Sequence, residues 1–134
     1  MSSTNKKIAI IGAGVAGLLA AVTAADRGAK VMLFEKMPKV GLKMGITGKG
    51  RCNLTNSAPI MDFIGKTPGN GKFLYSAYEA FSNEDLLELL HGYGLATKVE
   101  RGGRVFPASD DAQEVRHLFM RLLKEKKVEL HLEE

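Results

Sequence analysis

Cysteine is almost absent from this sequence, as is any segment of biased composition. Cys52 is the single cysteine among 134 residues, which excludes a disulfide framework, an internal dithiol and a zinc site built on cysteines alone. One free thiol fits a reducing compartment, so we expect a cytoplasmic protein. The sequence shows no internal repeat, low-complexity tract or interdomain linker, and its length is typical of one domain.

A strong excess of one charge is also lacking. The net charge is +4 and the sequence isoelectric point is about 9.2, too mild to indicate nucleic-acid binding without a clustered basic patch. The charge is uneven, because residues 1–57 carry nine Lys and Arg against two Asp and Glu, whereas residues 58–134 carry ten against thirteen. This basic front part suits a phosphate-bearing ligand, and a solvated lysine surface is the alternative explanation.

The stretch Ile8 to Ala25 has no charge over 18 residues and follows two lysines, as in a signal peptide or a short membrane span. Its internal pattern differs from both, because a β-branched run stops at Gly12-Ala13-Gly14 and an Ala- and Leu-rich helical segment follows. This order of strand, tight turn and buried helix predicts a soluble α/β protein, without export or membrane association.

Glycine is abundant, with fifteen residues or about 11% against a usual value of about 7%. Gly12-x-Gly14-x-x-Gly17 directly follows the predicted strand and opens the predicted helix, as in dinucleotide-binding proteins. Gly12 permits the tight turn, Gly14 lets a pyrophosphate approach the backbone, and Gly17 allows close packing of helix on strand. The first-turn N–H groups, including that of Ala16, then face the phosphates.

An acidic residue completes this βαβ unit, which we place at 7–35. Gly28 ends the helix, and the strand Lys30–Glu35 brings Glu35 to 21 residues beyond Gly14, where a carboxylate accepts hydrogen bonds from the adenosine ribose. The acid argues against NADP at this site. FAD and NAD share the pattern, and a flexible glycine loop beside an exposed Glu35 is the alternative.

A second glycine cluster fills residues 36–57, where a loop would wrap around an anionic ligand or simply be a mobile surface segment. Within it, Gly41-Leu42-Lys43 and Gly48-Lys49-Gly50-Arg51-Cys52-Asn53-Leu54-Thr55-Asn56 resemble the signature of bacterial flavoproteins that include aminoacetone oxidase and the bile-acid-inducible flavoprotein reductase. Residues 102–109 are similar to a second block of that family, and the resemblance extends from Lys7 to about Leu132. One departure is Lys49, where many relatives have a third glycine.

The resemblance implies an FAD-dependent oxidoreductase, with NAD(P)H as a candidate electron donor of the full-length protein. The implied cofactor contacts are the pyrophosphate at Gly12, Gly14 and Gly17, the ribose at Glu35, the adenosine or phosphates near Lys36 and Lys43, and the flavin end near Gly50, Arg51, Cys52 and Asn53. Family chains are about three times longer, so we expect an incomplete FAD-binding domain that is inactive alone. A non-catalytic nucleotide-binding module and an NAD-binding Rossmann domain are the alternatives.

Reactive side chains are scarce. Cys52 beside Arg51 is either a thiol of lowered pKa or, as we favour, a small partly buried residue at the cofactor. The spacing of His91, His117 and His131 indicates neither a metal site nor a catalytic triad. No residue is identified as a general acid or base, and the substrate is unknown.

The remaining chain predicts an insertion at 58–109, followed by a helix and a third strand at 110–132. Its expected elements are helices at Asn70–Phe81 and Ser82–His91 with Ser82 as N-cap, a hairpin of Ala96–Glu100 and Arg104–Phe106, a helix capped by Ser109, and a parallel strand at Val128–Leu132. The last helix has a core-facing apolar stripe, although a membrane-surface helix is an alternative. The fold class is therefore α/β, a Rossmann-like three-layer core with a parallel sheet and a helix and β-hairpin insertion.

Overall fold

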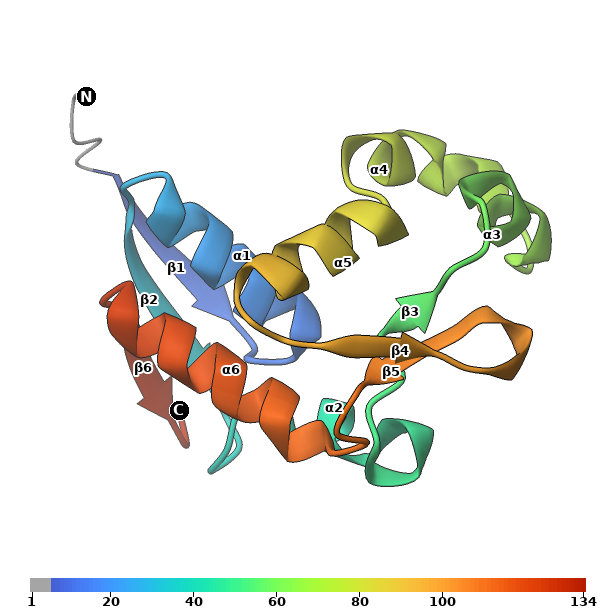
Figure 1. Cartoon of the computed structure of the whole chain (residues 1–134). Coiled ribbons are helices and arrows are strands. Elements are labelled where there is room, and N and C mark those ends of the chain that lie inside the picture. The colour runs from blue at the N-terminus through green and yellow to red at the C-terminus, as the bar shows by residue number, and fades with distance from the viewer. Residues whose placement is uncertain (1–5) are drawn as a thin grey trace.

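The computed structural model describes residues 6–134, in which two small sheets are combined with six α-helices (Figure 1). The strands are β1 (Lys7–Ile11), β2 (Lys30–Glu35), β3 (Thr55–Asn56), β4 (Thr97–Val99), β5 (Arg104–Pro107) and β6 (Glu129–Leu132). The helices are α1 (Val15–Asp26), α2 (Leu42–Ile46), α3 (Ile60–Lys66), α4 (Tyr75–Ala80), α5 (Asn83–Gly92) and α6 (Ala112–Glu125).

The larger sheet is parallel and has the strand order β1-β2-β6. Lys7 lies opposite Lys30 at the start of the β1–β2 pair, and Met32 lies opposite Glu129 at the start of the β2–β6 pair. Parallel neighbours require a crossover, and here α1 and α6 precede β2 and β6 in the chain. The predicted βαβ unit and the predicted third parallel strand are both confirmed.

The core lies between this sheet and the two long helices, which cover the same face of it (Figure 1). Leu33 of β2 and Leu18 of α1 are fully buried there, since the first βαβ unit is apolar on the facing sides. The apolar stripe of α6 is buried as predicted, which favours core packing over a membrane-surface role; its members are Val115, Leu118, Phe119, Leu122 and Leu123.

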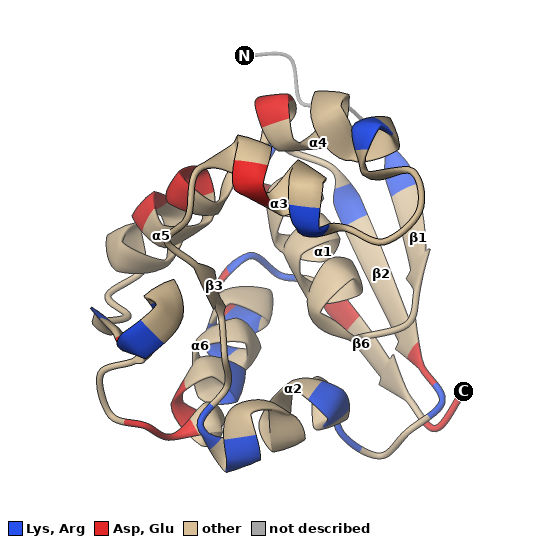
Figure 2. Ribbon diagram, turned by 90° about the vertical axis from the view of Figure 1, so that its right-hand side faces the viewer, with Lys and Arg blue, Asp and Glu red and all other residues tan. Residues whose placement is uncertain are grey.

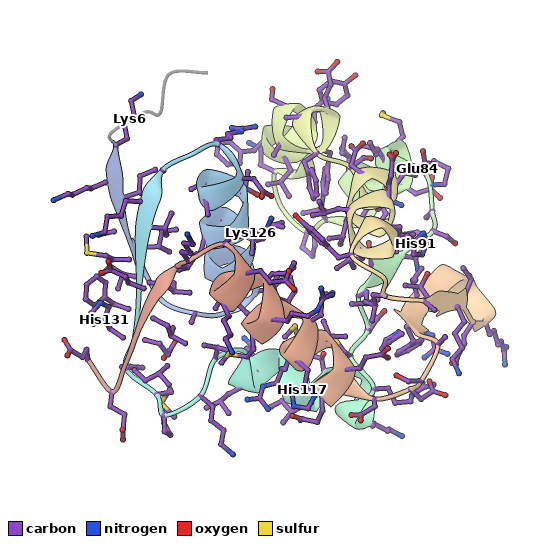
Figure 3. The ribbon with its side chains drawn as sticks, turned by 60° about the vertical axis from the view of Figure 1, so that its left-hand side comes forward. Lys6, Glu84, His91, His117, Lys126 and His131 are labelled. Carbon is purple, nitrogen blue, oxygen red and sulfur yellow. The ribbon has the colours of Figure 1, made fainter. Side chains whose placement is uncertain are left out.

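The opposite face of the parallel sheet is not covered by any described helix (Figures 1 and 2). Ile11 of β1 is 82% exposed although it belongs to the apolar run. Phe34 stacks on His131 with ring centroids 4.7 Å apart, and His131 points to the side away from α6 (Figure 3). Two of the three expected layers therefore lie within residues 6–134. None of the described helices has the length and apolar character needed to cross a membrane.

The insertion extends to one side of this core and contains the second sheet (Figure 1). The predicted hairpin is confirmed as β4 and β5, but it is not isolated, because β3 from the glycine-rich segment pairs antiparallel with β5. The expectation of a plain loop over 36–57 is corrected in the same way, since α2 and a 3₁₀ helix (Thr47–Gly50) lie within it. These elements are too short for a periodic apolar pattern, so the sequence did not predict them.

Helix boundaries in the insertion differ in detail from the prediction. The expected helix Asn70–Phe81 is a 3₁₀ turn (Gly71–Leu74) followed by α4, and α3 before it was not expected. Ser82 caps α5 as predicted, in a capping box with Asp85. Ser109 is not the N-cap of α6, because Asp111 accepts the N–H of Gln113 at 2.8 Å, while the Ser109 hydroxyl bonds the Glu114 side chain.

Candidate functional site

The turn between β1 and α1 is built by glycines with different tasks. Gly12 has a φ of +97°, and its N–H donates to the Phe34 carbonyl at 2.7 Å. A Cβ on Gly17 would lie 1.8 Å from the Gly12 carbonyl oxygen, so only glycine allows α1 to approach the turn this closely. A Cβ on Gly14 would meet nothing within 4 Å, so this side of the turn is open.

Gly14 is the N-cap of helix α1 and provides no side-chain hydrogen bond to its first turn. The N–H groups of Val15, Ala16 and Gly17 in its first turn have no intrahelical partner, because the carbonyls that would accept them precede the helix. They lie at the positive end of the helix dipole. This end of α1 therefore combines unpaired donors, open space and a favourable potential for an anionic group.

The side chain of Glu35, at the end of β2, is held by two backbone N–H groups, one from the turn before α1 and one from the segment after β2. Its Oε2 accepts the Ala13 N–H at 2.7 Å, and its Oε1 accepts the Met37 N–H at 2.9 Å. The bonds from Met37 and Ala13 lower the pKa of Glu35, so the side chain is a carboxylate at neutral pH. A carboxylate has about four acceptor positions, so two remain for donors of a ligand.

A cavity of about 340 Å³ opens beside Gly14, and Glu35 is not among its lining residues. Four elements form its walls: α1, α2, α5 and α6, together with the segment after the 3₁₀ helix. Most of the lining is apolar, so the cavity suits a planar or apolar group better than a phosphate. Its lining residues are Gly14, Val15, Leu19, Lys43, Met44, Thr47, Cys52, Asn53, Leu54, Leu86, Leu90, Val115 and Phe119.

Cys52 and Asn53 line this cavity from the glycine-rich segment. Cys52 is buried with a φ of +62°, and its N–H donates to the Thr47 carbonyl at 3.0 Å. Burial raises the pKa of the Cys52 thiol, which disfavours the thiolate and argues against the activated thiol considered from the sequence. With the amide nitrogen of Asn53 as donor, its side chain reaches the carbonyls of Thr55 at 3.0 Å and Val105 at 3.1 Å.

Arg51 lies outside the cavity wall and is paired within the protein. Its Nη1 donates to both oxygens of Glu100, at 3.1 and 2.9 Å, and to Oδ1 of Asp110 at 3.2 Å. Its guanidinium carbon is 4.0 Å from the centroid of the Phe106 ring. The structure therefore gives Arg51 a structural role in joining the glycine-rich segment to the hairpin, and a direct contact with a ligand stays a prediction.

The structure brings some of the predicted site residues together and separates others. Gly14, Lys43, Cys52 and Asn53 share the cavity, and Gly12, Gly17 and Glu35 form the adjoining turn. Lys36 is exposed after β2, Gly50 lies in the turn before Arg51, and the side chain of Ala16 lines a different groove with α5. Basic segments gather around α2 (blue in Figure 2).

Sequence reasoning missed the groups that complete the site. Ala13 and Met37 contribute backbone N–H groups, and the residue type at a position does not indicate such a contact. Leu86 and Leu90 lie within the helix predicted at Ser82–His91, but their place in the cavity wall depends on how α5 packs. The pairing of Arg51 with Glu100 joins residues 49 positions apart, and no local pattern signals it.

Comparison with curated proteins gives relatives over most of the chain. It is 38% identical over 130 residues to the 3-dehydro-bile acid delta(4,6)-reductase of Clostridium scindens, covering 93% of this chain and 30% of that protein. It is 33% identical over 111 residues to the ribosomal RNA dihydrouridine synthase of Escherichia coli, covering 79% of this chain and 26% of that protein. The chain thus spans about 30% of the length of these relatives.

A solved structure shares the fold at low sequence identity. THI4 of Thermovibrio ammonificans superposes with a TM-score of 0.62 and 17% identity, covering 96% of this chain and 38% of that one. Residues 6–134 also match the HI0933-like protein Rossmann domain. The resemblance carried by the Gly41–Asn56 block is thereby confirmed, and the chain belongs to the HI0933-like Rossmann-domain family.

Proposed function

We propose that this chain is the FAD-binding portion of an FAD-dependent oxidoreductase. The observation that carries the proposal is the N-terminus of α1, which has no side-chain cap and has open space at Gly14. Gly14 also lines the apolar cavity, and the preceding residue, Ala13, donates its N–H to the Glu35 carboxylate. In this proposal the helix N-terminus binds the pyrophosphate, Glu35 binds the adenosine ribose, and the cavity takes the isoalloxazine ring. When bound, the flavin accepts and donates the electrons of the reaction.

The residues of this chain bind and orient the cofactor. The N–H groups of Val15, Ala16 and Gly17 would hold the pyrophosphate, which the dipole of α1 also attracts. Glu35, ionised and fixed by Ala13 and Met37, would accept the ribose hydroxyl groups with its two remaining acceptor positions. The carboxylate would therefore bind the adenosine ribose without a change in its side-chain conformation.

The apolar cavity supports FAD over NAD as the ligand. Gly14 lies in its lining, and Leu54 and Phe119 are among its apolar walls. Such walls exclude water from an isoalloxazine ring, whereas a nicotinamide with its ribose presents a smaller and more polar group. Lys43 stands at the same cavity and would neutralise phosphate charge.

The wider biology is part of the proposal. We place the protein in a bacterial cytoplasm, which the single free Cys52 supports, with NAD(P)H as electron donor and no nucleic-acid or membrane partner. Its relatives are named for a bile acid and for ribosomal RNA, so their names do not point to one substrate class. The rest of a longer flavoprotein chain would supply the substrate site.

Purification followed by a visible absorption spectrum and titration with FAD, ADP and NAD tests the proposal. We expect flavin absorbance or FAD binding, and Gly14→Val should abolish the binding of all three because its side chain occupies the pyrophosphate position. Gly65→Val is the matched control, since Gly65 also has open space around it but lies in α3. A colourless chain that binds ADP or NAD but not FAD would contradict the proposal.

Glu35→Ala tests the adenosine half separately. We expect weaker binding of FAD and of ADP by about 1–3 kcal/mol, the range for lost hydrogen bonds to a charged group. The far-ultraviolet circular dichroism of the variant shows whether the turn still folds. Unchanged affinity in a folded variant would mean that the ribose binds elsewhere.

A further inference from the structure

Arg51 is the centre of an ion-pair cluster that joins three distant parts of the chain. It bonds Glu100, which follows β4, and Asp110, which precedes α6. Lys98 adds a second cation, pairing with Asp110 and, at 3.5 Å, with Glu100. The ring of Phe106 in β5, fully buried, supports the guanidinium from one side at 4.0 Å.

The segment that carries Arg51 has a strained backbone conformation that needs stabilising contacts. Gly48, Lys49, Gly50 and Cys52 all have a positive φ, between +58° and +83°, and Lys49 and Cys52 are not glycines. Left-handed conformations are disfavoured for L-residues and persist where the surroundings over-determine them. A flexible loop would relax out of this conformation, so an external anchor is required to keep it.

The anchored segment faces the cavity through the residues that follow it. Cys52 and Asn53 come directly after Arg51 and line the same cavity as Gly14. Asn53 continues the connection to the hairpin through the carbonyls of Thr55 and Val105. The position of this cavity wall is therefore set by Arg51 on one side and Asn53 on the other.

We propose that Arg51 is a positioning residue for the flavin end of the cofactor, holding the Gly48–Cys52 turn so that Cys52 and Asn53 form the cavity wall. The inference rests on the proposed function and replaces direct contact with the flavin by an action through the turn. The inference concerns the flavin half alone, because no hydrogen bond within residues 6–134 joins the Glu35 and Gly14 end of the site to the cluster.

Titration of the purified chain and its variants with FAD and, separately, with ADP tests this. In Arg51→Met we expect FAD affinity to fall about tenfold or more, in line with the loss of charged hydrogen bonds, while ADP affinity stays unchanged. Arg51→Lys should recover little, because an ammonium lacks the planar group that bonds the carboxylates and stacks on Phe106. Arg101→Met is the matched control. Arg101 is an exposed arginine in the turn between β4 and β5 and lies outside the cluster.

Glu100→Gln is the second variant, because it keeps the shape of the cluster and removes one charge. It should lower FAD affinity with ADP affinity preserved, and circular dichroism establishes that each variant is folded. Equal loss of FAD and ADP would overturn the inference in favour of a purely structural Arg51, and unchanged FAD affinity in a folded Arg51→Met would overturn it alone. Failure of the unaltered chain to bind FAD would overturn the proposed function and this inference with it.

Discussion

Gly17 and Gly14 belong to one motif, yet the structure gives them opposite tasks. Gly17→Ala places a Cβ 1.8 Å from the Gly12 carbonyl oxygen, so the helix or the turn must shift. We expect a loss of unfolding free energy of about 1–3 kcal/mol, the usual range for overpacking, measured by urea denaturation. Gly14→Ala is the control, and its stability should stay within about 0.5 kcal/mol because its Cβ meets open space.

Lys49 adopts a left-handed backbone conformation that glycine adopts more easily. Its φ is +58°, a conformation that costs an L-residue about 1–2 kcal/mol, whereas glycine adopts it freely at an entropic cost of about 0.5–1 kcal/mol. Lys49→Gly should therefore leave stability unchanged or raise it by up to about 1 kcal/mol in urea denaturation. Lys39→Gly, outside the left-handed residues, should lower it, and the reverse order would refute this account.

At the scale of elements, α5 depends on its N-terminal cap. The Ser82 hydroxyl accepts the Asp85 N–H at 3.1 Å, and the Asp85 carboxylate accepts the Ser82 N–H at 2.7 Å. Ser82→Ala should lower the free energy of unfolding by about 1 kcal/mol, measured by thermal or urea denaturation. Ser76→Ala, at an exposed position inside α4, is the control, and an equal loss in both variants would show that the cap is unimportant.

The parallel sheet shows that membership of a strand does not fix burial. Ile11 and Leu33 are both apolar residues of neighbouring strands, but Ile11 is 82% exposed and Leu33 is fully buried. The difference arises because α1 and α6 cover one face only (Figure 1). On the open face, Phe34 of β2 stacks on His131 of the edge strand β6.

For the molecule as a whole, a group of hydrogen-bonded carboxylates links stability to pH. The pKa values are lowered for Glu35 by the N–H groups of Met37 and Ala13, and for Asp85 by Ser82. The two carboxylates of the Arg51 cluster behave in the same way, Glu100 through Arg51 and Asp110 through Lys98.

A lowered folded-state pKa means that each carboxylate stabilises the fold fully above its unfolded value of about 4, and that this is lost as the pH falls through the folded value. We therefore expect the urea midpoint to be level near neutrality and to fall steeply in acid. The double variant Glu100→Gln, Asp110→Asn should be less stable at neutral pH and show a shallower acid decline. An acid decline as steep as that of the unaltered chain would rule out the cluster as its source.

The sequence determined the parts whose signals are local. The glycine spacing, the strand ending at Glu35, the Ser82 cap and the apolar stripe of α6 depend on periods of a few residues, so they were predictable. So was the family, through the Gly-Arg-Cys-Asn block at residues 50–53. In each case the signal lies in residues that are close together in the sequence.

Only the tertiary structure decided which groups line the cavity and which hold the protein together. Arg51 lies beside Cys52 in the sequence, but it turns away to Glu100 and Asp110, while Cys52 faces the cavity with its thiol pKa raised. Glu35 is fixed by backbone N–H groups that any residue except proline would provide. Pairings across 49 or 59 positions depend on how the insertion packs against the core, and burial and charge pairing emerge only from that packing.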